Sequence, residues 1–187
     1  VYMNDNDKNN NIERNAKEKP NEIGGITGQD PTIYGGWQHK GKQIKILPYK
    51  PEELFNLVLD VKSYPEFLPW CQAARIILED NNQIIAELVI QLKGFSDKYQ
   101  SRIIYCQDQI YSIDVEAISG PFKYLKNSWK FSKENTGTKL EFDIDFKMKL
   151  AIVDRLVETF FSEATQKIVN AFEKRAKTLL GSNKVSN

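Results

Sequence analysis

The sequence is poor in the side chains that build metal sites. It has a single histidine, His39, and two cysteines, Cys71 and Cys106, among 187 residues. Zinc sites need three or four clustered His, Cys or carboxylate ligands, and these cysteines have no C-x-x-C spacing. We therefore expect no metal site and no cofactor, with His39 as a solvated side chain. We expect the two cysteines to be buried free thiols rather than a disulfide.

The sequence also lacks an excess of charge and a long apolar run. Its 26 basic and 25 acidic residues give a net charge of +1, which offers little attraction to phosphate, so a nucleic-acid partner is not expected. No apolar run approaches the roughly 20 residues that cross a bilayer, and we expect no secretory leader. The apolar fraction of 41% is ordinary for a globular domain.

Composition changes along the chain. Residues 1–20 are Asn-rich and charged, which predicts a disordered tail. Residues 21–41 mix glycines with scattered aromatics and show no regular period, which is typical of a linker or of an extended segment that docks on a partner. We expect the folded domain to cover residues 42–181, followed by a short tail, 182–187.

Residues 21–41 resemble the C-terminal motif of a small succinate dehydrogenase assembly factor. The matching residues are Glu22-Ile23-Gly24-Gly25, Pro31-Thr32, Tyr34-Gly35, Trp37 and Lys40-Gly41. The resemblance implies contact with the flavoprotein subunit of succinate dehydrogenase. A fusion of two adjacent reading frames is an alternative origin for this order of segments.

The most regular pattern lies near the C-terminus. Apolar residues at steps of three and four predict one long helix over about 150–180, with Asp154 on its polar face and Gly181 as its stop. The apolar stripe contains Ile152, Leu156, Phe160, Ala164, Ile168, Phe172, Ala176 and Leu179, widened by Val153, Val157 and Phe161.

The residues before this helix predict strands with two short helices among them. Residues 42–47 alternate as a first strand, Pro51 opens a helix, and the Pro-bounded stretch 61–71 predicts a second. From 72 to 149, apolar and polar residues alternate in about six segments separated by short turns. This is an α+β pattern, in which a curved antiparallel sheet of about seven strands folds round the long C-terminal helix.

The predicted inner face of the sheet is unusually aromatic. Aromatic rings at regular spacing usually fill a core, and that interpretation stands for each ring taken singly. A curved sheet and a straight helix nevertheless leave space between them, which favours an apolar ligand cavity. The acidic residues of the strands alternate onto the outer faces, so general acid–base chemistry is not expected inside; they are Asp114, Glu116, Asp143 and Asp145.

Over about residues 42–180 the chain is similar to the coenzyme-Q-binding START-domain family. The motifs are Leu47-Pro48-Tyr49, Leu57-Val58, Asp60-Val61, Ser63-Tyr64-Pro65, Phe67-Leu68-Pro69-Trp70-Cys71, Gly120-Pro121-Phe122-Lys123 with Leu125, and Trp129-Lys130-Phe131. The resemblance implies a helix-grip fold that binds ubiquinone or a related polyprenyl lipid and supports respiration. Bacterial relatives within this resemblance are ribosome-association toxins.

The leading hypothesis is therefore a non-catalytic lipid-binding protein, not an enzyme. We expect the lipid between the sheet and the long helix, lined by Trp70, Leu125, Trp129, Phe142, Phe146, Phe160 and Phe161. We expect the cavity entrance at Phe67, Leu68, Phe122 and Tyr124, which would touch a membrane surface transiently. The expected location is the bacterial cytoplasm beside the inner membrane, or the matrix side of a mitochondrion, near the respiratory complexes. The alternatives are a ribosome-associating translation inhibitor and a cyclase- or dehydratase-type enzyme.

Overall fold

The computed structural model describes residues 39–181, apart from the side chains of residues 159, 160 and 162. The assembly-factor-like motif and the Asn-rich tail therefore fall largely or wholly outside the described residues. The elements are β1 (His39–Leu47), α1 (Pro51–Leu59), a 3₁₀ turn (Val61–Ser63), α2 (Tyr64–Phe67), β2 (Cys71–Asp80), β3 (Gln83–Leu92), β4 (Phe95–Gln107), β5 (Tyr111–Ala117), β6 (Phe122–Glu134), β7 (Gly137–Met148) and α3 (Ala151–Leu180). No helix in this range is long and apolar enough to cross a membrane.

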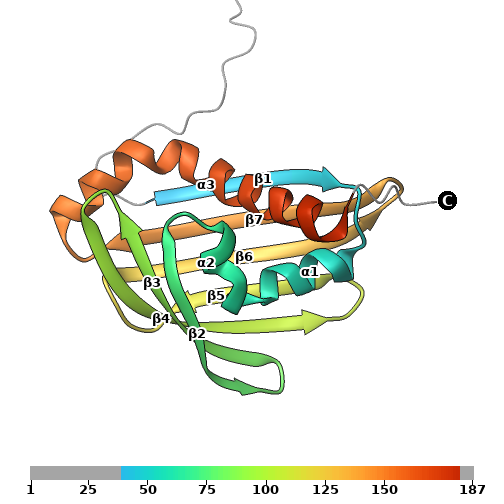
Figure 1. Cartoon of the computed structure of the whole chain (residues 1–187), viewed down its shortest axis with the longest axis horizontal. Helices are drawn as coiled ribbons and strands as arrows, with labels where there is room; N and C mark the ends of the chain where they lie inside the picture. The colour runs from blue at the N-terminus through green and yellow to red at the C-terminus, as the bar shows by residue number, and fades with distance from the viewer. Residues whose placement is uncertain (1–38, 182–187) are drawn as a thin grey trace, which may run out of the picture. The chain divides into compact units, whose positions relative to one another are not determined.

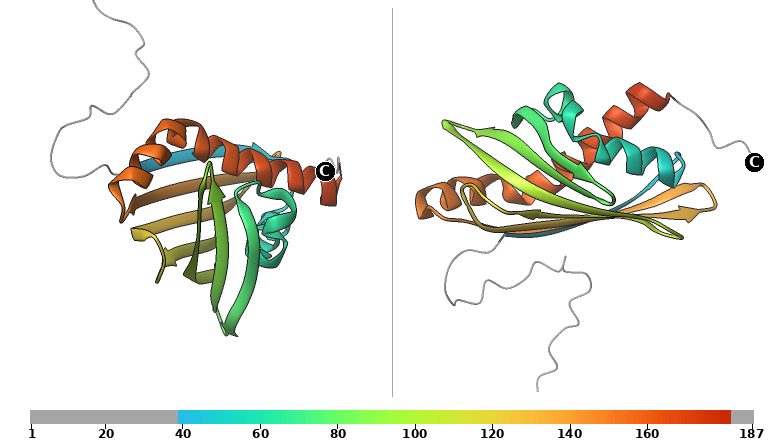
Figure 2. Two further views of the ribbon diagram at one scale, coloured as in Figure 1. Left: turned by 60° about the vertical axis from the view of Figure 1, so that its left-hand side comes forward. Right: turned by 90° about the horizontal axis from the view of Figure 1, so that it is seen from below.

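The seven strands within residues 39–181 form one antiparallel sheet in the order β1-β7-β6-β5-β4-β3-β2. Strands β2 to β7 are a meander, and β1 closes the far side by pairing with β7. The sheet curves, and α1, α2 and α3 lie on its concave side (Figures 1 and 2). This is the predicted helix-grip architecture.

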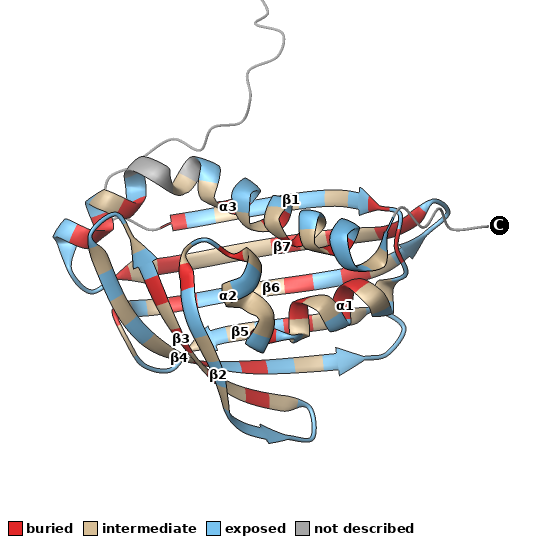
Figure 3. Cartoon of the chain, viewed as in Figure 1, coloured by how far each residue is buried: buried red, intermediate tan, exposed pale blue. Residues whose placement is uncertain are grey.

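Alternation along the strands produces the buried face. In β3, Ile84, Ala86, Leu88 and Ile90 are buried, and their neighbours in sequence are more exposed. In β7 the same period buries Leu140, Phe142, Phe146 and Met148. Figure 3 shows buried and more exposed positions along the strands.

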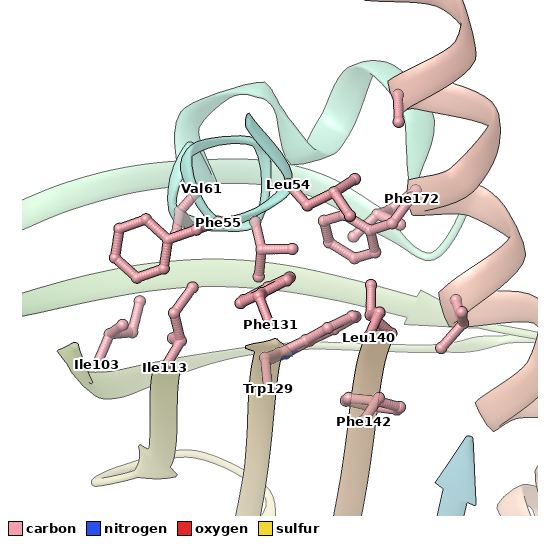
Figure 4. Packing of buried hydrophobic residues seen from close by; sticks show 14 of the residues in the cluster. Leu54, Phe55, Val61, Ile103, Ile113, Trp129, Phe131, Leu140, Phe142 and Phe172 are labelled. Carbon is pink, nitrogen blue, oxygen red and sulfur yellow. The ribbon is translucent and has the colours of Figure 1, made fainter. Parts of the chain in front are cut away.

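The core beneath α1 is built from aromatic and aliphatic side chains that meet edge to face. Phe55 and Phe131 are both fully buried, with ring centroids 6.1 Å apart and planes at 87°. Helix α1 begins at Pro51, and the Glu53 carboxylate accepts the Lys50 backbone N–H at 2.9 Å, which supports the helix start. Figure 4 shows Leu54 and Phe55 facing the sheet residues Ile113, Phe131 and Leu140.

The first strand, β1, differs from the expected strand in where it begins and in which of its side chains point towards the core. It begins at His39 rather than at residue 42. Before Leu47, which is buried in the core, its inward residues are polar or small, and Ile44 and Ile46 are exposed on the outer face. Inward-facing Lys45 binds Asn170 and Glu173 of α3, and a Cβ added at Gly41 would lie 2.3 Å from Cγ2 of Thr165. Glycine at position 41 therefore lets α3 approach this strand closely.

The sequence-based expectations for five individual side chains are wrong. His39 was expected in solvent, but it is buried against Asp154, and Asp154 faces inward rather than along the polar side of α3. Ile152 and Leu179 were placed on the buried stripe, but both are exposed. Both cysteines are free as expected, but Cys106 is exposed rather than buried.

Candidate functional site

A cavity of about 390 Å³ lies between the concave face of the sheet and helix α3. Strands β2 to β7 supply its floor and far wall, and α3 supplies residues from Leu156 to Phe172. Val58 of α1 and Tyr64 of α2 close the side next to the main core. Most of its surface is aliphatic or aromatic, which suits a largely apolar ligand.

Six of the residues expected to contact a lipid line this cavity: Trp70, Leu125, Trp129, Phe142, Phe146 and Phe161. The seventh, Phe160, has a side chain outside the described part of the structure. Of the four expected entrance residues, Leu68 and Phe122 line the cavity, whereas Phe67 and Tyr124 are absent from its lining.

Local geometry explains the two exceptions. Phe67 packs against Phe172 with ring centroids 5.1 Å apart, and the guanidinium carbon of Arg175 lies 5.3 Å from its ring centroid. In β6 the pairing register shifts between Phe122 and Tyr124, so the alternation that puts Phe122 inside does not carry over to Tyr124.

The aromatic side chains of the cavity hold one another in place. The rings of Trp129 and Phe142 are 4.3 Å apart, and Trp129 also meets Phe172 of α3 at 5.0 Å. At the other end, Phe146 lies 5.3 Å from Phe161 and 5.9 Å from Phe122. These contacts fix one wall at each end and leave the space between them open.

A few polar residues also face the cavity, and none of them is among the residues predicted from the sequence to bind the ligand. They are Tyr64, Lys93, Tyr99, Ser101, Asn127 and Lys167. The alternation of the strands indicates two of them from the sequence. It puts Ser101 on the same face as Tyr99 and Ile103, and Asn127 on the same face as Leu125 and Trp129.

The ionisable groups on the α2 side are held in their neutral forms. Burial raises the pKa of the Cys71 thiol to about 11, partly opposed by its contact with the Ala73 carbonyl. Burial also raises the pKa of the Tyr64 and Tyr99 hydroxyls above the ordinary tyrosine value. The Tyr64 hydroxyl donates to the Val58 carbonyl at 2.5 Å. At neutral pH this wall therefore carries a thiol and phenols rather than a thiolate or phenolates.

A buried polar pair lies beside the cavity. Nε2 of His39 is 2.9 Å from Oδ1 of Asp154, and the His39 ring lies 4.9 Å from Phe146 and 5.1 Å from Phe161, both cavity residues. Neither His39 nor Asp154 is among the cavity-lining residues. Within residues 39–181, no group of three or more His, Cys, Asp or Glu side chains could hold a metal ion.

Comparison with known proteins identifies the fold that carries this cavity. The family model described as "Polyketide cyclase / dehydrase and lipid transport" matches residues 47–173, most of the chain. The chain belongs to this family. A second model, described as a protein of unknown function (DUF1674), matches residues 3–44, and its description does not mention an assembly factor.

Individual members of the polyketide cyclase / dehydrase and lipid transport family differ in name. The "Ribosome association toxin RatA" of Rickettsia prowazekii is 59% identical over 138 residues, covering 73% of this chain and 94% of that protein. The mitochondrial "Coenzyme Q-binding protein COQ10 homolog B" of Xenopus laevis is 27% identical over 82% of this chain and 64% of that protein. The solution structure of the 18 kDa protein CC1736 from Caulobacter crescentus is 36% identical, with a TM-score of 0.63, and covers 77% of this chain and 99% of that one.

Proposed function

We propose that this chain binds ubiquinone or a related polyprenyl lipid in the cavity between the sheet and α3, without catalysing a reaction on it. The observation that carries the proposal is the cavity of about 390 Å³ with its largely aliphatic and aromatic lining. Each buried CH₂ group contributes about 0.8 kcal/mol, so a prenyl chain can gain affinity there without a charged anchor. The family description, which includes lipid transport, and the COQ10 relative support the same ligand class.

The side chains around the cavity support binding rather than catalysis. Among the described lining residues there is no His, Asp or Glu. Cys71 and Tyr99 are held neutral by burial, so neither supplies a ready nucleophile or base at neutral pH. The family description also includes cyclase and dehydrase, so an enzyme of that type is the alternative in this class.

The same proposal includes transient contact with a membrane surface at one end of the sheet. Ile118 precedes β6, and Leu150 and Ile152 flank the start of α3, with exposed fractions of 41%, 61% and 79%. The two segments adjoin, because the Lys149 backbone N–H donates to the Pro121 carbonyl at 2.8 Å. Exposed aliphatic side chains beside lysines such as Lys149 and Lys123 suit an interface with anionic lipid, as at the cytoplasmic side of a bacterial inner membrane.

The experiment that tests the proposal is organic extraction of the purified protein followed by mass spectrometry, with ubiquinone added in a parallel sample. Recovery of a prenyl quinone, or saturable uptake of added ubiquinone at one molecule per chain, is the expected result. Absence of both would overturn the proposal. A converted product of the added quinone would favour the enzyme instead.

A second candidate function is association with the ribosome. It is favoured by the 59% identity to the Rickettsia prowazekii protein named a ribosome association toxin. Binding through protein contacts is compatible with the chain's near-neutral charge. Cosedimentation with ribosomal subunits in a sucrose gradient at moderate salt tests it, and a lipid carrier without this activity would stay at the top of the gradient. Contact with succinate dehydrogenase or other respiratory complexes stays a prediction.

A further inference from the structure

Three polar side chains face the cavity from two strands of its floor. Tyr99 and Ser101 belong to β4, and Asn127 belongs to β6, on the opposite side of β5. Ser101 is paired across the sheet with Ala117 of β5, and Asn127 is paired with Val115 of the same strand. Because the β5 side chains between them are short, the floor there leaves room for a ring that reaches both neighbouring strands.

The Asn127 amide has a hydrogen-bond donor to offer to the cavity. Nε1 of Trp129 lies 3.2 Å from Oδ1 of Asn127, and an indole N–H is always a donor, so this contact fixes which end of the amide is the oxygen. The remaining group is the NH₂. Among the described residues it has no hydrogen-bond partner in the protein.

The two side-chain hydroxyl groups of β4 that face the cavity also lack a hydrogen-bond partner within the described part of the chain. Neither Ser101 Oγ nor the Tyr99 hydroxyl has a hydrogen-bond partner within the described part of the chain, although Ser101 is almost fully buried. The position of Tyr99 is fixed, because its ring meets Phe122 edge-on at 5.2 Å and Gly120 packs against its Cβ. Burial raises the pKa of Tyr99, so its hydroxyl keeps its proton and can donate.

Charge is absent from this part of the cavity. The charged residues among the described lining are Lys93 and Lys167. Lys167 binds Glu163 on its own helix at 2.7 Å, and Lys93 lies in the exposed turn between β3 and β4. A carboxylate on the floor would therefore lose its hydration without gaining a counter-charge, whereas a neutral carbonyl would lose little and gain hydrogen bonds.

We propose that Tyr99, Ser101 and Asn127 form a donor site that recognises the neutral carbonyl oxygens of a lipid headgroup lying on the cavity floor. The inference rests on the proposed function and specifies its ligand further. A 1,4-quinone carries two carbonyl oxygens on opposite sides of one ring, which matches donors on the two sides of β5. The headgroup then lies inside on the sheet, and the apolar chain follows the aromatic walls.

The test compares three probes that share a ten-carbon chain: decyl-ubiquinone, decylbenzene and decanoate. Affinity is measured by displacement of the neutral fluorophore N-phenyl-1-naphthylamine from the full chain. Tyr99→Phe and Ser101→Ala each remove one oxygen with little change of shape. Tyr105→Phe is the matched control, because that hydroxyl donates to the Asn81 carbonyl at 2.7 Å and lies outside the cavity lining.

The expected result is that each cavity variant weakens decyl-ubiquinone about two- to tenfold, the range of one neutral hydrogen bond. Decylbenzene is expected to change by less than about twofold, and Tyr105→Phe to bind all three probes as the unaltered chain does. The unaltered chain is expected to prefer decyl-ubiquinone to decanoate. Equal loss for quinone and hydrocarbon, no loss for either, or a preference for decanoate would overturn the donor site and leave the cavity intact. Failure of the unaltered chain to bind any apolar probe would instead overturn the proposed function.

Discussion

Asp154 of α3 and His39 of β1 are hydrogen-bonded at 2.9 Å, with each side chain only 5% exposed. The same Oδ1 of Asp154 accepts the backbone N–H of Met148 at 3.2 Å. One buried carboxylate thus joins the beginning of β1, the end of β7 and the first turns of α3. An acidic side chain near a helix N-terminus is also favoured by the helix dipole.

Replacing this carboxylate should destabilise the fold. Asp154→Ala leaves the His39 ring and the Met148 N–H buried without their acceptor, so we expect the free energy of unfolding to fall by about 3 kcal/mol. Urea denaturation followed by circular dichroism measures it. Glu158→Ala, at an exposed position one turn further along α3, is the control and should change stability by less than about 0.5 kcal/mol. A loss at Asp154 no larger than the control's would show that the pair contributes little.

The contact between β1 and α3 predicts a pair of compensating substitutions. Gly41→Ala puts a methyl group 2.3 Å from Cγ2 of Thr165, so the helix must shift, and we expect a loss of about 1–3 kcal/mol. Thr165→Ala removes the obstructing methyl group. The double variant should therefore be more stable than the sum of the two single losses predicts, which a double-mutant cycle in urea measures. Simple additivity would contradict the close approach.

Filling the cavity should block the ligand without unfolding the protein. Ala164 of α3 lines the cavity, and Ala164→Leu adds three carbons to that space. We expect ubiquinone uptake to fall at least about tenfold, because displacing a ring or chain from the cavity costs more than about 1.4 kcal/mol. Gln166→Leu makes a similar apolar change on the exposed side of the same helix and should bind normally. Equal binding by both variants would show that the ligand lies elsewhere.

The two cysteines should differ in reactivity with pH. Cys106 is exposed, whereas burial raises the pKa of Cys71 to about 11. The thiolate is the reactive form, so alkylation of Cys71 should be slow at pH 8 and rise about tenfold per pH unit towards pH 11. Iodoacetamide labelling of the Cys106→Ser variant, followed by mass spectrometry, isolates Cys71. Rapid labelling at pH 8 would mean that its thiol is neither buried nor raised in pKa.

The fold could be predicted from the sequence because strand and helix periods differ clearly. The alternation of apolar residues in β3 and β7 implies one buried face on each strand, and the three–four spacing in α3 implies one buried face on the helix. A single sheet covered by this helix buries all of these faces. Short turns, such as Gly120-Pro121 before β6, mark where one strand ends and the next begins. The pattern of residues 47–173 is also the part that the family model matches.

Side chains whose burial depends on a distant partner could not be predicted in this way. Asp154 looks like a surface residue until His39 is brought beside it from 115 positions away. Ile152 has the spacing of a core residue, but its side chain is 79% exposed, whereas its neighbours Val153 and Asp154 are buried. Phe67 was expected at the cavity entrance, and only the packed position of Phe172 shows that its ring turns elsewhere.

The two halves of α3 are held by unequal amounts of apolar contact. Val169, Phe172 and Ala176 join the large core with α1, whereas Val153 and Val157 join a smaller cluster with Leu125, Phe146 and Met148. Local opening costs least where the fewest apolar side chains separate. Backbone amides in the first turns of α3 should therefore exchange with deuterium sooner than those around Phe172. Such fraying would uncover the side of the cavity formed by Leu156 and Val157, giving a bulky ligand a route inside while the sheet stays folded.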